Sequence, residues 1–277
     1  MEIRNELIEL LLHVNEVVDV PAVSRIFMPE PTPSPDRDSE FGIVVLEDGS
    51  AGLYYAWMGE AQKGMNQRYH VDDFIGSSPL DMLRLYQGQH EADRSLGMAA
   101  INAISQSVFR QAGLSLANAE GSMGALEITD DDHVGMVGYF PSLVRRLTEK
   151  GIRVTVIEKK KHLLHQGTKL VMTADPAALQ SCTKVMSTAS TLLNDTLDEI
   201  LSCCGNASLV NLIGPTAGFL PDPLFHRGVS AIGGSQIVDV ELAIRNISEK
   251  KGLGPAARKY LLKREDYPGF AGLFSGH

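Results

Sequence analysis

The chain has few cysteines and no long apolar run. Only three cysteines, Cys182, Cys203 and Cys204, occur among 277 residues, and this odd number gives no sign of a disulfide framework. No uncharged stretch approaches the ~20 apolar residues that cross a membrane. The N-terminus also lacks the cationic start and the small-residue cleavage site of a secretory signal. We therefore predict a cytoplasmic protein without a membrane partner.

Basic residues are in the minority. The chain contains 25 Lys and Arg against 34 Asp and Glu, which gives a formal net charge of −9. Nucleic-acid binding depends mainly on Lys and Arg that neutralise phosphates, so this balance argues against a nucleic-acid partner. The hydrophobic fraction of 44% and the charged fraction of 21% are ordinary for a globular protein, and the length suits two domains.

Several catalytic and metal-binding motifs are also missing. The sequence has no Walker loop, nucleophile elbow or HExxH motif. Cys203 and Cys204 are adjacent, so on a helix their side chains diverge by about 100° and do not readily chelate one ion together. His162 and His165 would share one helical face, but no third ligand lies near them in the sequence. Spacing leaves open whether three further residues join a metal site through the fold: His133, Asp222 and His226.

The clearest positive signal is one βαβ unit in the middle of the chain. The apolar run 134–137 ends at Gly138, and Pro141 suits the first position of a helix that Gly151 ends. Residues 154–157 then form a short strand rich in β-branched residues. This pattern predicts two neighbouring parallel strands joined by a helix.

The residue at the end of that second strand is relevant to which cofactor the fold could bind. Glu158 follows it directly, and in dinucleotide-binding folds an acidic residue near this point binds the ribose hydroxyls. The turn from Gly138 to Pro141 nevertheless lacks the further glycines of the GxGxxG fingerprint. The pattern therefore predicts the fold and leaves the cofactor open.

The N-terminal half predicts a mixture of helices and antiparallel strands. A helix is expected over Ile3 to Val18, a hairpin over Phe41 to Leu46 and Gly52 to Trp57, and helical structure between Ser78 and Ala112. Alternate prolines in Met28 to Glu40 favour an extended exposed loop. We predict a smaller α+β domain over residues 1–120.

The C-terminal half alternates strands and helices. Further strands are expected at 183–187 and 209–213, with helices at about 196–204 and 239–250. This order predicts a doubly wound, mostly parallel α/β sheet over residues 121–277, with the junction near Gly121.

Ligands of such a sheet collect beyond the carboxyl ends of its strands, and three loops should converge there. They begin at Gly138, Thr188 and Gly214. Each loop also has a purely structural interpretation. Thr196 with Glu199 matches a capping box, so its hydroxyl is readily explained as a helix cap.

The other polar residues of these loops are equally open. Asn194 either binds an anion at a helix N-terminus or simply forms a turn. Glu158 is either a ligand or a solvated charge beside Lys159. The glycines and prolines after Gly214 fix either a site or a rigid crossover.

At these segments the chain resembles a family of two-domain proteins described as "putative heavy-metal chelation". The resemblance rests on VGMVGYFPSLVRRL with VTVIE, then STASTLLNDTLDEIL, then LIGPTAGFLPDPLFHRGVSAIGGSQIVD, and more loosely on LGMAAINAIS. It implies an enolase-N-terminal-like domain ahead of a Rossmann-like domain, with a ligand site in the cleft between them. The residues implied for that site are Gly138, Tyr139, Phe140, Pro141, Glu158, Thr191, Asn194, Thr196, Gly214, Pro215, Thr216 and Asn102.

Three functional hypotheses follow. The leading one is a protein that binds a small polar or anionic ligand between two domains, with a heavy metal or a metal chelate among the candidates that the resemblance implies. The alternative is an enzyme that uses an adenosine-containing cofactor such as S-adenosylmethionine, with Glu158 on the ribose. The third is an interaction module without ligand chemistry, which should expose a large apolar surface.

Overall fold

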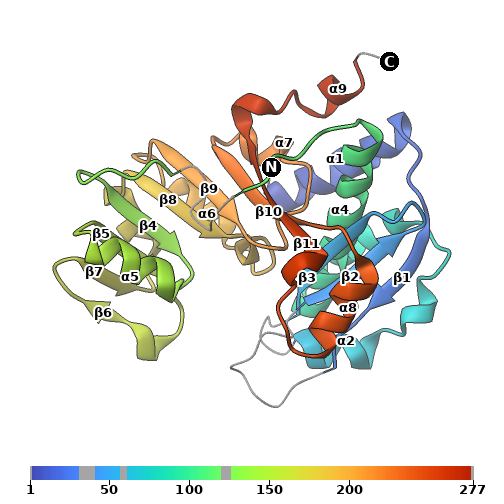
Figure 1. Ribbon diagram of the computed structural model, residues 1–277, viewed down its shortest axis with the longest axis horizontal. Coiled ribbons are helices and arrows are strands. Elements are labelled where there is room, and N and C mark those ends of the chain that lie inside the picture. Colours follow the sequence, from blue (N-terminus) through green and yellow to red (C-terminus); the bar gives the residue numbers. More distant parts are fainter. Residues whose placement is uncertain (1, 31–40, 57–60, 120–125, 276–277) are drawn as a thin grey trace.

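The fold is given by a computed structural model that describes residues 2–30, 41–56, 61–119 and 126–275. Two β-sheets organise it (Figure 1). The small antiparallel sheet lies in the N-terminal half and has the order β1 (Val23–Phe27), β2 (Phe41–Leu46), β3 (Ala51–Tyr55). The large sheet has eight strands and is mostly parallel. This arrangement confirms the predicted α/β fold class with a smaller antiparallel sheet ahead of the parallel one.

The large sheet has the order β11-β10-β9-β8-β4-β5-β7-β6. Its strands are β4 (His133–Val137), β5 (Arg153–Ile157), β6 (His165–Gln166), β7 (Leu170–Thr173), β8 (Lys184–Thr188), β9 (Leu209–Ile213), β10 (Ala231–Ile237) and β11 (Ala257–Lys263). The central strands β7-β5-β4-β8-β9-β10 are all parallel. Numbered along the chain, they stand in the order 3-2-1-4-5-6 of doubly wound sheets. In such sheets the ligand crevice opens where the order reverses, which is between β4 and β8 here.

Helices cover both sheets. They are α1 (Ile3–Val17), α2 (Ala61–Arg68), α3 (Leu83–Tyr86), α4 (Glu91–Gln111), α5 (Pro141–Glu149), α6 (Leu197–Ser202), α7 (Asp222–Phe225), α8 (Val240–Ser248) and α9 (Phe270–Leu273). The predicted βαβ unit is confirmed as β4-α5-β5, with Pro141 in the first turn of α5. No helix in the described part of the chain has the length and apolarity of a membrane span.

The structure divides the predicted helical stretch from Ser78 to Ala112. A 3₁₀ turn and α3 come first, and the chain then turns sharply at Gly88 before α4 begins. A Cβ atom at Gly88 would lie 2.7 Å from Asp93 Cβ and 2.9 Å from the Leu85 carbonyl oxygen. This crowding requires glycine at the turn. The helical structure predicted between Ser78 and Ala112 is present as these separate elements.

Strands β10 and β11 were not predicted from the sequence. β10 contains Gly233 and Gly234, which carry little β-propensity and interrupt the hydrophobic pattern. The two strands pair antiparallel over their whole length, from Ala231 opposite Lys263 to Ile237 opposite Ala257. They therefore extend the parallel sheet by an antiparallel edge.

Helix α4 lies at the centre of the molecule. Every residue from Ala92 to Phe109 is buried. One side of α4 packs so closely on β3 that a Cβ atom at Gly52 would lie 2.0 Å from the Ala99 carbonyl oxygen. Its opposite side, with Ile101 and Ile104, joins a core that contains α1 and residues of the large sheet.

The two halves of the chain interlock. Helix α8, from the C-terminal half, packs Ala243 and Ile247 on Ile43 and Leu53 of the small sheet. Helix α1, from the N-terminal half, shares a core with residues of β9, β10 and β11. The expected domain junction near Gly121 lies outside the described residues, as do Trp57 and residues 31–40 of the proline-rich loop. The division into residues 1–120 and 121–277 stays a prediction.

The close packing of β3 on α4 gives a testable prediction. We expect Gly52→Ala to lower the free energy of unfolding by about 2 kcal/mol, because the added methyl group would overlap backbone atoms of α4. Thermal unfolding followed by circular dichroism measures the effect. Gly205→Ala is the control, since nothing lies within 4 Å of a Cβ atom at that position. Equal melting temperatures for the two variants would contradict this packing.

Candidate functional site

The three loops predicted to converge lie side by side at the carboxyl edge of the large sheet. Gly138 has a φ of +88°, which favours glycine, and a Cβ atom there would lie 3.3 Å from Thr188 Cγ2. Gly214 has a φ of +146°, and a Cβ atom there would lie 3.4 Å from Ala189 Cβ. The turns after β4, β8 and β9 are therefore in contact around the point where the strand order reverses.

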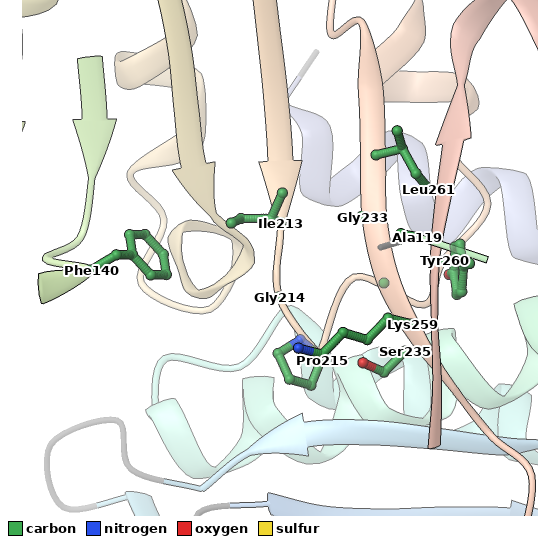
Figure 2. A pocket seen from close by; sticks show the side chains of 11 residues that line it. Ala119, Phe140, Ile213, Gly214, Pro215, Gly233, Ser235, Lys259, Tyr260 and Leu261 are labelled. Atoms are coloured by element: carbon green, nitrogen blue, oxygen red, sulfur yellow. The ribbon is translucent and has the colours of Figure 1, made fainter. Parts of the chain in front are cut away.

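A cavity of about 220 Å³ opens at this edge (Figure 2). Its wall is formed mainly by the β4–α5 turn, by the end of β9 with the loop that follows, and by the β10–β11 pair. The lining residues are Ala119, Phe140, Ile213, Gly214, Pro215, Gly233, Gly234, Ser235, Lys259, Tyr260 and Leu261. Of the residues implied for the site, Phe140, Gly214 and Pro215 line this cavity together.

Backbone register explains the shape of the cavity. Gly233 pairs with Ile213 on one side and with Leu261 on the other, so these three positions share one face of the sheet. Because Gly233 has no side chain, the space above β10 stays open between the two apolar side chains. A glycine inside a strand is typical of a place that another group approaches closely.

Two polar side chains stand at one end of the cavity. Ser235 and Lys259 are directly opposite each other in the β10–β11 pair, so both side chains project from the same face. Ser235 is only 8% exposed, and its hydroxyl forms no hydrogen bond with any residue that the structure describes. Lys259 is exposed at the mouth of the cavity, and its ammonium takes part in no ion pair within the described ranges. An ammonium and a hydroxyl donor without protein partners can receive an anionic group.

Other residues implied for the site lie elsewhere. Tyr139 and Pro141 flank Phe140 but do not line the cavity. Glu158 is half-buried, and its carboxylate accepts a hydrogen bond of 3.0 Å from the Lys160 backbone amide, which holds it in its own turn. Thr191 lines a second cavity of about 320 Å³. That cavity also contains Arg4, Tyr86, Asp195 and Asp198.

The loop before α6 differs from the capping-box interpretation. The Thr196 hydroxyl donates a hydrogen bond of 2.6 Å to Asn194 Oδ1, and it does not cap α6. The capping prediction is therefore wrong, because a neighbouring side-chain acceptor competes with the helix amide for the same hydroxyl. Asn194 and Thr196 satisfy each other and line neither cavity.

Asn102 connects the two halves of the chain. Its Nδ2 donates to the carbonyl oxygens of Leu53 and Thr216, each at 2.8 Å, and its Oδ1 accepts from the Gly218 amide at 3.2 Å. The residue is 1% exposed. Asn102 therefore holds the loop after β9 against β3 and does not face open space. Thr216 is also buried. Its carbonyl oxygen accepts one of these hydrogen bonds from Asn102, and it does not line the cavity.

The chain does not offer a metal centre in its described part. No group of three or more His, Cys, Asp or Glu residues comes close enough to hold an ion there. His162 lies in a 3₁₀ turn and His165 on β6, so the predicted shared helical face is wrong. Burial raises the pKa of Cys182 to about 11 and that of Cys204 to about 12, which keeps both thiols protonated at neutral pH. The residues present therefore do not fit a directly coordinated heavy metal.

Sequence reasoning missed the β10–β11 side of the cavity. Gly233, Ser235, Lys259 and Leu261 lie on two strands that the hydrophobic pattern did not predict. The adjacent glycines at 233 and 234 were the available signal, because glycine within an extended segment marks a close approach.

The strand order and the loops at its switch point define a mixed α/β protein with a cavity at the carboxyl edge of its parallel sheet. The chain belongs to the DUF364 family, described as "Putative heavy-metal chelation", and matches it over residues 122–265. It is also 30% identical over 213 residues to an uncharacterized protein of Methanocaldococcus jannaschii, a match that covers 74% of this chain and 76% of that protein.

Two solved structures share the fold. A DUF364 protein of unknown function from Pyrococcus horikoshii superposes with a TM-score of 0.67 at 21% identity, over 94% of this chain and 98% of its own. A DUF364 protein from Desulfitobacterium hafniense gives a TM-score of 0.70 at 19% identity, over 94% of this chain and 97% of its own. At this identity the likeness concerns the fold alone.

The role of Asn102 can be tested directly. We expect Asn102→Ala to lower the free energy of unfolding by about 3 kcal/mol, because three buried backbone groups lose their hydrogen-bond partner. Urea denaturation measures the change. Asn118→Ala removes the same side chain from an exposed position and should have little effect. If the two variants are equally stable, the loop after β9 does not depend on Asn102.

Proposed function

We propose that the protein binds a small anionic organic ligand in the cavity between Phe140, Gly214, Ser235 and Lys259. In this proposal the site stands at the junction of an enolase-N-terminal-like domain, residues 1–120, and a Rossmann-like domain, residues 121–277. The observation that carries the proposal is that a hydroxyl and an ammonium, neither bonded to any described residue, lie together at one end of an otherwise apolar cavity. Its position at the carboxyl edge of a doubly wound sheet supports a ligand site.

The size of the cavity limits the ligand. Pockets for drug-sized molecules hold about 300–1,000 Å³. The volume here is about 220 Å³, so the ligand is smaller than a dinucleotide. Most of the lining is apolar, which favours a ligand with an apolar body and one polar end.

The family description suggests a heavy metal, and the proposal assigns the metal an indirect role. Heavy metals such as zinc prefer thiolate, imidazole and carboxylate ligands. Among the described residues that line the cavity there is no Cys, His, Asp or Glu. We therefore propose that a metal reaches this site only as a chelate, with its coordination supplied by the organic ligand.

An enzyme that uses an adenosine-containing cofactor is the second candidate. The strand order 3-2-1-4-5-6 and an acidic residue, Glu158, at the end of the second of these strands favour it. The hydrogen bond from the Lys160 amide to the Glu158 carboxylate argues against it, since that carboxylate is engaged in its own turn and Glu158 is not among the residues that line the cavity. The large exposed apolar side chains are few and lie on several elements, which gives the interaction module no comparable support.

The proposal is tested by filling the cavity. Gly233→Val places a side chain against Ile213 in the space above β10, whereas Gly205→Val places one in open solvent. Thermal unfolding is recorded against divalent metals, adenosine cofactors and small organic anions, because a ligand at 100 times its Kd stabilises by about 2.7 kcal/mol. We expect organic anions to raise the melting temperature of the wild type and of Gly205→Val, and not that of Gly233→Val.

Other outcomes of this experiment would contradict the proposal. A shift confined to adenosine compounds and lost in Glu158→Ala would favour the cofactor enzyme. A shift with a free divalent metal that a chelator reverses, and that Gly233→Val leaves unchanged, would place a metal site elsewhere in the chain.

A further inference from the structure

The polar groups of the cavity are gathered at one end. Figure 2 shows the Lys259 side chain extending toward Pro215, with the Ser235 hydroxyl on the same side. Ser235 is more than nine-tenths buried and lines the cavity, yet its hydroxyl has no partner among the described residues. The hydroxyl oxygen itself is not among the buried atoms that lack a partner, so it is reached from the cavity, where water or a ligand group satisfies it. This end of the cavity therefore suits one compact anionic group.

The opposite end is apolar. Phe140, Ile213 and Leu261 form its sides (Figure 2). The backbone of β10 forms its floor at Gly233, where a Cβ atom would lie only 3.2 Å from Ile213 Cγ2. A planar group can lie close to a bare strand backbone, whereas a puckered ring projects hydrogens toward it. The Phe140 ring also provides an edge or face for aromatic contact.

The volume decides how many rings fit. A closed apolar cavity of about 150 Å³ accommodates one benzene molecule in a protein core. The cavity here measures about 220 Å³ and is open on one side, which gives space for one ring with a carboxylate-sized substituent.

Resting on the proposed function, we propose that the ligand is a planar monocyclic aromatic carboxylate. Its ring lies over Gly233 beside Phe140, and its carboxylate accepts hydrogen bonds from the Lys259 ammonium and the Ser235 hydroxyl. One ammonium balances one negative charge, so a monoanion fits this end better than a phosphate dianion. Lys259 thus determines specificity for charge, and Gly233 determines specificity for shape.

Benzoate, benzamide and cyclohexanecarboxylate are suitable probes. Benzamide has the shape of benzoate without its charge, and cyclohexanecarboxylate has the charge without the flat ring. Isothermal titration of the full chain gives the dissociation constant of each. We expect benzoate to bind about tenfold more tightly than benzamide, the difference that one charge-assisted hydrogen bond supplies. It should also bind more tightly than cyclohexanecarboxylate, because the puckered ring cannot lie as close to the bare backbone at Gly233.

Two lysine variants locate the charge recognition. Lys259→Met should weaken benzoate about tenfold, to the level of benzamide, and leave benzamide unchanged. Lys263→Met is the matched control, because Lys263 lies on the same strand and the same face but pairs with Glu265 at 3.3 Å and lines a different cavity. Ser235→Ala should weaken benzoate by a smaller factor, since it removes a neutral donor.

Several outcomes would overturn the inference. It is overturned if benzoate does not bind the wild type, or if benzamide or cyclohexanecarboxylate binds as tightly as benzoate. It is also overturned if Lys259→Met leaves the dissociation constant of benzoate unchanged. If benzoate does not bind but other small anions do, and Gly233→Val abolishes their binding, the aromatic carboxylate is excluded and the proposed function stands. The proposed function fails together with the inference if Gly233→Val changes the binding of no small anion.

Discussion

The burial of helix α4 on every side is the constraint on which the rest of the structure depends. Small residues, Ala99 and Ala103 against Gly52, bring its backbone into contact with β3. Its larger side chains pack against the core under the large sheet. Polar side chains of this enclosed helix bind the backbone of the loop after β9: Asn102 and Gln106 donate through their side-chain amides, and the Ser105 hydroxyl accepts from the Leu220 amide. The helix that joins the two halves therefore also fixes one wall of the cavity.

The cavity combines two kinds of strand pairing. The parallel strands β4, β8 and β9 bring their loops to one edge, as expected of a doubly wound sheet. The antiparallel strand β11 then adds Lys259 directly opposite Ser235, which a purely parallel sheet could not provide at that edge. The family description of heavy-metal chelation and the absence of metal-donor side chains from the cavity lining are compatible if the organic ligand, and not the protein, holds the metal.

Residues close in sequence were predicted well, and residues that meet through the fold were not. The β4-α5-β5 unit follows from local hydrophobic period, Pro141 and the glycine turns, because these act within a few residues. The roles of Glu158 and Thr196 were harder to predict. Each side chain forms a local hydrogen bond, Glu158 with the Lys160 amide and Thr196 with Asn194, which competes with ligand binding or helix capping. The domain division and the other site residues stay predictions.

By itself the sequence determined the class of fold and which loops meet, because strand order and turn chemistry depend on local propensity and periodicity. Only the tertiary structure decided which side chains surround the cavity. Asn102 is separated from Thr216 by 114 residues, and its side-chain amide donates its hydrogen bonds to the backbone carbonyls of Leu53 and Thr216. Ser235 and Lys259 face each other only through the register of a β-pair. The register of distant strands and the competition for hydrogen bonds have no local signature in the sequence. They decide which side chains line the cavity at the edge where the loops were predicted to meet.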